Sequence, residues 1–142
     1  MNYTGIGDLI VEFDGGVLSL TLNRPDSLNS LTEPMLKTLA DILQFAATDP
    51  EVKVVRLGGA GRGFSSGAGI SADDQAAATI SEGVDPLLAE ANRTVRAIAA
   101  LPKPVVAVVQ GPTAGVGVSL ALACDVVLAS DKAFFLLAFT KI

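Results

Sequence analysis

Residues 103–125 read KPVVAVVQGPTAGVGVSLALACD, and this stretch decides the fold. Its first apolar run, Val105–Val109, is short and rich in β-branched residues, which is typical of a buried strand. A glycine-rich turn follows from Gln110 to Gly117, and the uncharged segment Gly115–Ala123 has the length of a short buried helix. A strand that leads through a glycine turn directly into a helix indicates an α/β architecture.

The same stretch carries no charge between Pro104 and Cys124, which is long enough to raise the alternative of a membrane span. Glycines, a proline and a glutamine interrupt it, and Lys103 and Asp125 flank it. A buried strand, a turn and a buried helix explain these interruptions better. We therefore expect no membrane span.

Four further strands are predicted besides Val105–Val109. Apolar residues alternate with polar ones over residues 9–13 and 18–22, and Asp14-Gly15-Gly16 between them is typical of a hairpin turn. Residues 52–57 form the next expected strand, and residues 125–129 form the last.

Two helices are predicted between these strands. Thr32 is expected to cap a helix that has Pro34 as its second residue and stops at Asp49-Pro50. Its buried face is expected to comprise Leu36, Leu39, Leu43 and Ala46. The second helix is indicated by the spacing of Leu88, Ala91, Val95 and Ile98, and Leu101-Pro102 ends it. Residues 71–85 are polar and alanine-rich, and we expect either a mobile loop or a marginal helix there.

Strands that alternate with helices argue for an α/β fold with a largely parallel, covered sheet, preceded by a hairpin. The chain has no internal repeat or linker, so we expect one core domain over residues 1–142. Residues 134–142 are strongly apolar and no polar cap follows them. We therefore expect that the chain is a fragment or that a partner covers this segment.

The composition excludes several classes of function. A net charge of −5 and a pI near 4.5 give no electrostatic reason to bind nucleic acid. The absence of histidine removes the commonest general base and the commonest zinc ligand. A single cysteine cannot form an internal disulfide, and the first residues lack a signal-peptide pattern, so a cytoplasmic setting is expected.

Two glycine-rich turns, residues 58–69 and 110–117, each follow a buried strand. Such turns can direct free backbone N–H groups at a ligand, and an oxyanion or a phosphate is the natural occupant. Neither turn matches the dinucleotide pattern, and no Gly-Lys-Ser/Thr is present. The alternative is that these glycines only allow tight turns.

Three segments in this order resemble the enoyl-CoA hydratase/isomerase (crotonase) family. They are residues 22–31 (LNRPDSLNSL), residues 54–70 (VVRLGGAGRGFSSGAGI) and residues 103–125. The resemblance implies a crotonase-type ββα spiral core that lacks the family's carboxy-terminal helical region. It also implies assembly as a homo-trimer or hexamer, because relatives form such assemblies.

The resemblance places an oxyanion hole for a CoA thioester at the backbone N–H groups of Ala68 and Val116, where most relatives carry glycine at the second position. It places the CoA moiety along Asp26, Ser27 and Leu28 and along Ser66, Ala68 and Ile70. Ser27 is equally compatible with an ordinary loop role. Arg24 and Arg62 are expected either to pair with CoA phosphates or to face solvent. No separate cofactor is implied, since CoA is part of the substrate.

The catalytic acids of the family are where this sequence departs. Hydratases use two glutamates, and the corresponding positions here hold Ser119 and Phe139. The run 133–142 resembles instead the branch of delta-3/delta-2 enoyl-CoA isomerases, whose single acid lies on the following segment. Asp73 and Asp74 are the nearest carboxylates, and a solvated loop is their other interpretation.

The resulting expectation is an acyl-CoA enzyme of fatty-acid or aromatic-acid metabolism, with isomerisation favoured over hydration because hydration needs two acid–base groups. A non-catalytic acyl-CoA binder that has lost its acids is the alternative. A third interpretation is a truncated or degenerate family member with no activity of its own.

Overall fold

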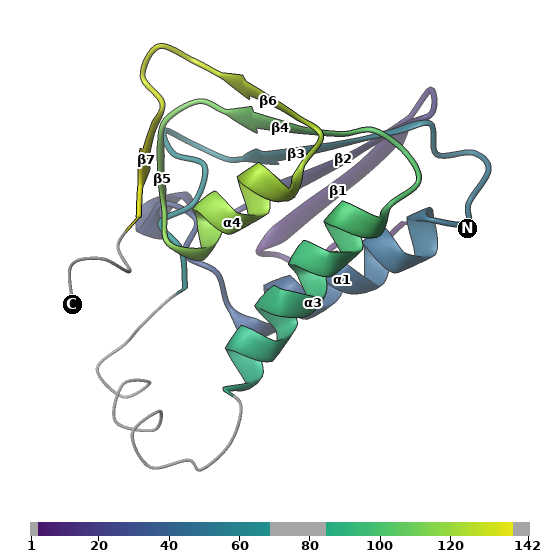
Figure 1. Ribbon diagram of the computed structural model, residues 1–142, viewed down its shortest axis with the longest axis horizontal. Coiled ribbons are helices and arrows are strands. Elements are labelled where there is room, and N and C mark those ends of the chain that lie inside the picture. Colours follow the sequence, from purple (N-terminus) through teal and green to yellow (C-terminus); the bar gives the residue numbers. More distant parts are fainter. Residues whose placement is uncertain (1–2, 69–84, 138–142) are drawn as a thin grey trace.

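The computed structural model describes residues 3–68 and 85–137, and it has the mixed α/β architecture expected from the sequence (Figure 1). Its main sheet has five strands in the order β1-β2-β3-β4-β6. The segment 71–84, for which a loop or marginal helix is expected, lies outside the described residues.

The sheet begins with the expected hairpin. Strand β1 (Leu9–Asp14) pairs antiparallel with β2 (Val17–Leu22), and Asp14 lies opposite Val17. The two turn residues, Gly15 and Gly16, have φ values of 58° and 84°. Positive φ at both positions matches the turn type that best fits the twist of a two-residue hairpin.

The remaining strands of the main sheet run parallel. They are β3 (Val54–Gly59), β4 (Val105–Val109) and β6 (Val126–Ala129). The prediction of residues 52–57 for β3 is two residues early at both ends. Val52 is buried but precedes the ladder, which continues through the glycines until Gly59 lies opposite Leu22.

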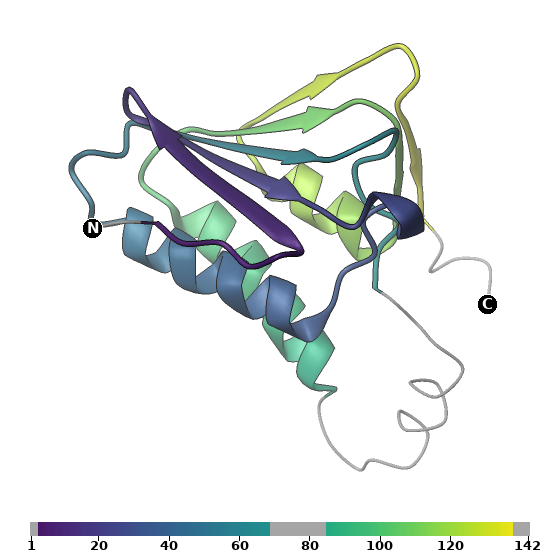
Figure 2. The same cartoon turned by 180° about the vertical axis from the view of Figure 1, so that it is seen from behind.

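The helices α1 (Glu33–Ala46), α3 (Pro86–Ala100) and α4 (Val116–Ala123) lie on one face of this sheet (Figures 1 and 2). Thr32 caps α1 by accepting a hydrogen bond from the Met35 amide at 3.3 Å, and Pro34 is the second helical residue, as predicted. The described residues place no α-helix on the opposite face, so in this part of the chain the helices cover one face of the expected parallel sheet.

One helix face differs from the prediction. Leu88 was expected to be buried in α3, but 48% of it is exposed. The buried positions of α3 are Ala91, Thr94 and Ile98. Thr94 can be buried on this face because its hydroxyl lies 3.0 Å from the Leu36 carbonyl and 2.8 Å from the Glu90 carbonyl, and its single O–H can donate to either. A hydroxyl whose hydrogen bond is made can therefore be buried at a position that the spacing of apolar residues does not predict.

A second, two-stranded parallel sheet and a short 3-10 helix were not predicted. Strands β5 (Pro112–Ala114) and β7 (Phe134–Leu136) form this sheet beside one end of the main sheet, and η1 (Pro25–Ser27) follows β2 (Figure 1). Elements of three residues carry too little periodicity to be recognised from sequence.

Apolar side chains are exposed along the carboxy-terminal elements. They include Leu122 on α4, Val126 and Leu128 on β6, and Phe134–Leu137 in and just after β7. Phe134–Leu137 belong to the segment for which a fragment or a covering partner is expected, and that expectation stays a prediction. Among the described residues, no helix has the length and apolarity needed to cross a membrane.

Candidate active site at two touching glycine loops

The two glycine-rich loops predicted from the sequence come together at the ends of β3 and β4. Ser65 and Thr113 form a parallel bridge between them. The Phe64 amide donates to the Pro112 carbonyl at 3.1 Å, and the Ala114 amide donates to the Ser65 carbonyl at 2.9 Å. The loops are therefore joined by backbone hydrogen bonds over residues 64–65 and 112–114.

One close approach between the loops involves Gly67 in the first loop and residues 114–116 in the second. A Cβ added at Gly67 would lie 2.9 Å from the Ala114 oxygen and 3.4 Å from the Val116 nitrogen. Gly67 has φ +96° and Gly115 has φ +54°. Only glycine combines this backbone conformation with so close a contact. The segments that carry Ala68 and Val116 therefore touch.

The direction of the Ala68 N–H follows from the bond that the carbonyl of the same peptide plane makes. The Gly67 carbonyl, which shares that plane, accepts a hydrogen bond from the Leu31 amide at 2.7 Å. In a trans peptide the N–H points opposite to the C=O, so the Ala68 N–H points away from Leu31. Within residues 3–68 and 85–137 it has no hydrogen-bond acceptor.

The amide of Val116 is arranged in the same way at the start of α4. The Gly115 carbonyl accepts from the Val118 amide at 3.0 Å, so the Val116 N–H points out of the amino end of the helix. It too lacks an acceptor in the described part of the chain. Two unpaired backbone donors on touching segments can stabilise negative charge that develops on an oxygen atom.

The residues predicted to contact CoA are partly brought together. The Ser66 amide donates to the Leu28 carbonyl at 2.7 Å, and its hydroxyl donates to the Ser27 carbonyl at 2.9 Å. Asp26 lies in η1 and is exposed. The segment 26–28 is thus docked on the first glycine loop next to Ala68. Ile70, the remaining predicted residue, lies outside the described residues.

Arg24 has a role that the sequence did not suggest. Its Nη1 donates to the Ser30 carbonyl at 2.9 Å and to the Ser30 hydroxyl at 2.8 Å, and its Nε lies 3.9 Å from Asp8. The guanidinium therefore organises the loop between β2 and α1. Arg62 is exposed, which fits the alternative that it faces solvent.

Two amide side chains, the buried Asn29 and the half-buried Gln110, hold the first loop, and sequence reasoning missed both. Asn29 is 0% exposed, and its Nδ2 donates to the carbonyls of Ala60 and Gly63 at 2.9 and 3.0 Å. Gln110 Nε2 lies 2.7 to 2.9 Å from the carbonyls of Gly59, Gly61 and Gly63. Both residues lie within the quoted motifs, but their acceptors are distant in sequence.

The family resemblance assigns the first glutamate position to Ser119, which carries no carboxylate. Ser119 lies on α4 three residues after Val116 and is exposed. Phe139, Asp73 and Asp74 lie outside the described residues. Cys124 is half-buried, and burial together with the charge of Asp125 raises the pKa of its thiol to about 12. It is therefore protonated at neutral pH and is a poor nucleophile.

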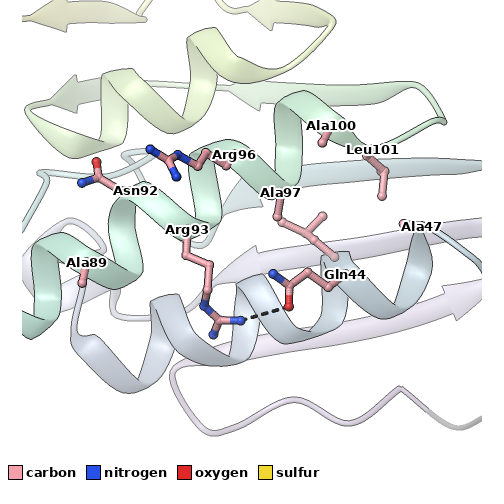
Figure 3. Close-up of a pocket in the computed structure, with 10 residues that line it drawn as sticks. Gln44, Ala47, Ala89, Asn92, Arg93, Arg96, Ala97, Ala100 and Leu101 are labelled. Carbon is pink, nitrogen blue, oxygen red and sulfur yellow. Dashed lines mark hydrogen bonds between the residues drawn. The ribbon is translucent and has the colours of Figure 1, made fainter.

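A groove of about 680 Å³ runs between α1 and α3 (Figure 3). Arg93 crosses it and donates to Gln44 Oε1 at 3.1 Å and to Asp41 at 2.9 Å. All of its lining residues belong to the two helices or to the residue that follows each of them, and none belongs to the glycine loops. This groove is therefore separate from the candidate site.

The chain is similar to known proteins of one family. The family model described as enoyl-CoA hydratase/isomerase matches residues 12–142. The 1,2-epoxyphenylacetyl-CoA isomerase of Escherichia coli K12 is 39% identical over 139 residues, which cover 94% of this chain and 52% of that protein.

Solved structures of the family have the same fold. An enoyl-CoA hydratase from Mycobacterium avium subsp. paratuberculosis K-10 is 65% identical with a TM-score of 0.86, and the match covers 98% of this chain and 53% of that one. A monofunctional enoyl CoA isomerase from M. smegmatis is 34% identical with a TM-score of 0.73, covering 92% and 53%. The chain thus spans about half the length of these relatives. It has the predicted crotonase-type α/β fold and belongs to the enoyl-CoA hydratase/isomerase family.

Proposed function

We propose that this chain binds an acyl-CoA thioester and holds its carbonyl oxygen between the backbone N–H groups of Ala68 and Val116. The observation that carries the proposal is the contact of Gly67 with residues 114–116, which places two unpaired donors on touching segments. Family membership supports the substrate class, since the relatives named above include proteins that act on CoA esters.

The chemistry follows from the two donors. Hydrogen bonds to the thioester oxygen draw electron density from the carbonyl and make the proton on the adjacent carbon more acidic. The enolate formed when that proton leaves carries its charge on the same oxygen. A backbone donor aimed at such an oxygen contributes about 3 kcal/mol of transition-state stabilisation.

Isomerisation is the reaction we favour within this family. Moving a double bond needs one group that carries a proton between two carbons, whereas hydration needs a base for water and an acid for the carbon. Ser119 occupies the first hydratase glutamate position and offers no carboxylate. Two of the relatives, from E. coli and M. smegmatis, are isomerases.

For the CoA moiety, we propose the surface formed by Asp26, Ser27, Leu28 and Ser66, with Ile70 assigned by resemblance alone. The hydrogen bonds from Ser66 to residues 27 and 28 support it, because they hold that surface beside Ala68. CoA is then part of the substrate and no further cofactor is needed. We also propose a cytoplasmic homo-trimer or hexamer, by analogy with the family.

An assay with 2-enoyl-CoA and 3-enoyl-CoA tests the proposal in wild type and in Gly67→Ala. The substitution forces a Cβ to 2.9 Å from the Ala114 oxygen and should abolish conversion. Gly15→Ala is the matched control, since Gly15 also has positive φ but a Cβ there meets nothing within 4 Å. Conversion of neither substrate by folded wild type would contradict an enzymatic role.

The exposed Ser119 also favours a second candidate, a non-catalytic acyl-CoA binder. Titration calorimetry with butyryl-CoA separates the two. Binding without turnover of either enoyl-CoA supports the binder, whereas the absence of binding would exclude it and the enzyme together.

A further inference from the structure

Ser65 belongs to the first glycine loop, forms a bridge with Thr113 of the second and is 0% exposed. Its hydroxyl donates to the Asn29 carbonyl at 2.9 Å and accepts from the Gly67 amide at 3.1 Å. A hydroxyl has one donor and can accept at its lone pairs, so both roles are satisfied at once. The first loop is thereby tied to the buried turn at Asn29.

This hydroxyl occupies the Gly67 amide, which directly precedes the Ala68 amide in the first loop. Gly67 has its N–H bonded to Ser65 and its carbonyl bonded to Leu31. Both peptide planes that meet at Gly67 are therefore held, and the next free donor is the Ala68 N–H. Without the Ser65 hydroxyl, the peptide between Ser66 and Gly67 would lose its anchor.

Ser65 also contacts the segment that carries the second donor. A Cβ added at Gly117 would lie 2.8 Å from both the Cβ and the carbonyl oxygen of Ser65. The same carbonyl accepts from the Ala114 amide at 2.9 Å. Residues on both sides of Val116 are thus packed on, or bonded to, this one serine.

We propose that Ser65 is a positioning residue that sets the relation between the Ala68 and Val116 amides. Its hydroxyl orients the first loop, and its backbone and Cβ seat the second. The expected effect of Ser65 on a bound thioester rests on the function proposed above. Its effect on the two amides is independent of any ligand and can be measured separately.

Amide exchange in the ¹⁵N-labelled full chain tests the ligand-free part. In Ser65→Ala, the Gly67 amide should exchange about three- to tenfold faster because it has lost its acceptor. The resonances of Ala68 and Val116 should both move. Thr94→Val removes another buried, hydrogen-bonded hydroxyl, on α3, and should leave all three amides unchanged.

The inference is overturned if Gly67 exchange is the same in Ser65→Ala and wild type, or if Thr94→Val changes the three amides equally. Ser65→Cys is the second variant should the alanine form fail to fold. Its thiol is a weaker donor and acceptor, so intermediate exchange at Gly67 is expected.

A carbonyl-labelled thioester tests the ligand-dependent part. Bound butyryl-CoA with a ¹³C=O group should show a lower carbonyl stretching frequency in wild type, because both amides polarise the bond. Ser65→Ala should show a smaller shift and about three- to tenfold weaker binding. An equal shift in both proteins would overturn the positioning role. No shift in bound wild type, with the exchange result intact, would instead contradict the proposed function alone.

Discussion

Individual buried side chains determine the shape of the candidate site, and Asn29 has the most demanding position. It has φ +56°, is fully buried, and its Oδ1 accepts from the Arg24 amide at 2.7 Å while its Nδ2 bonds two carbonyls of the first glycine loop. Asparagine tolerates this backbone conformation better than most residues and can satisfy donors and acceptors together.

Asn29→Ala should therefore destabilise the fold by about 3 kcal/mol, from lost hydrogen bonds and a strained φ. The measurement is the free energy of unfolding in urea. Asn92→Ala, at an exposed position on α3, should change it by less than about 0.5 kcal/mol. A loss at Asn29 no larger than at Asn92 would show that these bonds contribute nothing net.

A second prediction at this scale concerns pH and the bond from the Tyr3 hydroxyl to Asp49 Oδ2 at 2.6 Å. Burial and the Asp49 carboxylate raise the pKa of Tyr3 above its usual 10.0. The hydrogen bond from Tyr3 lowers the pKa of Asp49 below its usual 3.8. Stability from Tyr3 is present below pH 10.0 and is lost as the pH rises further, whereas stability from Asp49 is lost as the pH falls below 3.8.

Tyr3→Phe should therefore weaken the fall in stability at both ends of the pH range. Urea midpoints measured from about pH 3 to about pH 11 give the profile. Asp131→Asn is the control, because Asp131 is exposed and its side chain has no hydrogen bond or ion pair in the described part of the chain. Parallel profiles for wild type and Tyr3→Phe would refute the coupling.

At the scale of elements, glycines, which have no side chain, let the two glycine-rich loops approach each other closely. Gly111 shows this most clearly, since an added Cβ would lie 2.0 Å from the Arg62 carbonyl oxygen. That contact joins the end of β4 to the first glycine loop, and neither backbone can retreat without breaking the bonds at Ser65 and Pro112.

Gly111→Ala should cost about 3 kcal/mol or more, because backbone atoms would have to move. Thermal unfolding compared with Gly7→Ala checks this, since a Cβ at Gly7 meets nothing within 4 Å. Equal melting temperatures for the two variants would mean that the loops separate easily.

Prediction from sequence succeeded for elements whose local pattern and burial agree. In the hairpin, the two glycines mark the tight turn, where both have positive φ. In α1, the Thr32 cap, the proline in the first turn and the spacing of the apolar residues all indicate the same helix. It failed for β5 and β7, which are too short to show a period, and at Leu88, where Thr94 takes the buried place. The contact between Gly67 and residues 114–116 joins segments far apart in sequence, so only the family resemblance pointed to it.

At the scale of the whole molecule, ligand binding and folding are coupled if the site is as proposed. A thioester that binds only the folded chain stabilises it by about 2.7 kcal/mol at a hundredfold excess over its Kd. Butyryl-CoA should therefore raise Tm by several degrees in wild type and in Gly15→Ala. Gly67→Ala should show no such rise, and an unchanged rise in that variant would place the ligand elsewhere.

The uncovered apolar margin at β6 and β7 also affects how the molecule behaves in solution. Within the part of the chain that the structure describes, β6 is the outermost strand of the main sheet on that side, and 57% of Leu128 is exposed. A strand with unpaired backbone groups and apolar side chains can act as a template for another copy of itself. Concentrated samples of this chain should therefore be limited by colloidal association, with the folded state intact, before they are limited by thermal unfolding.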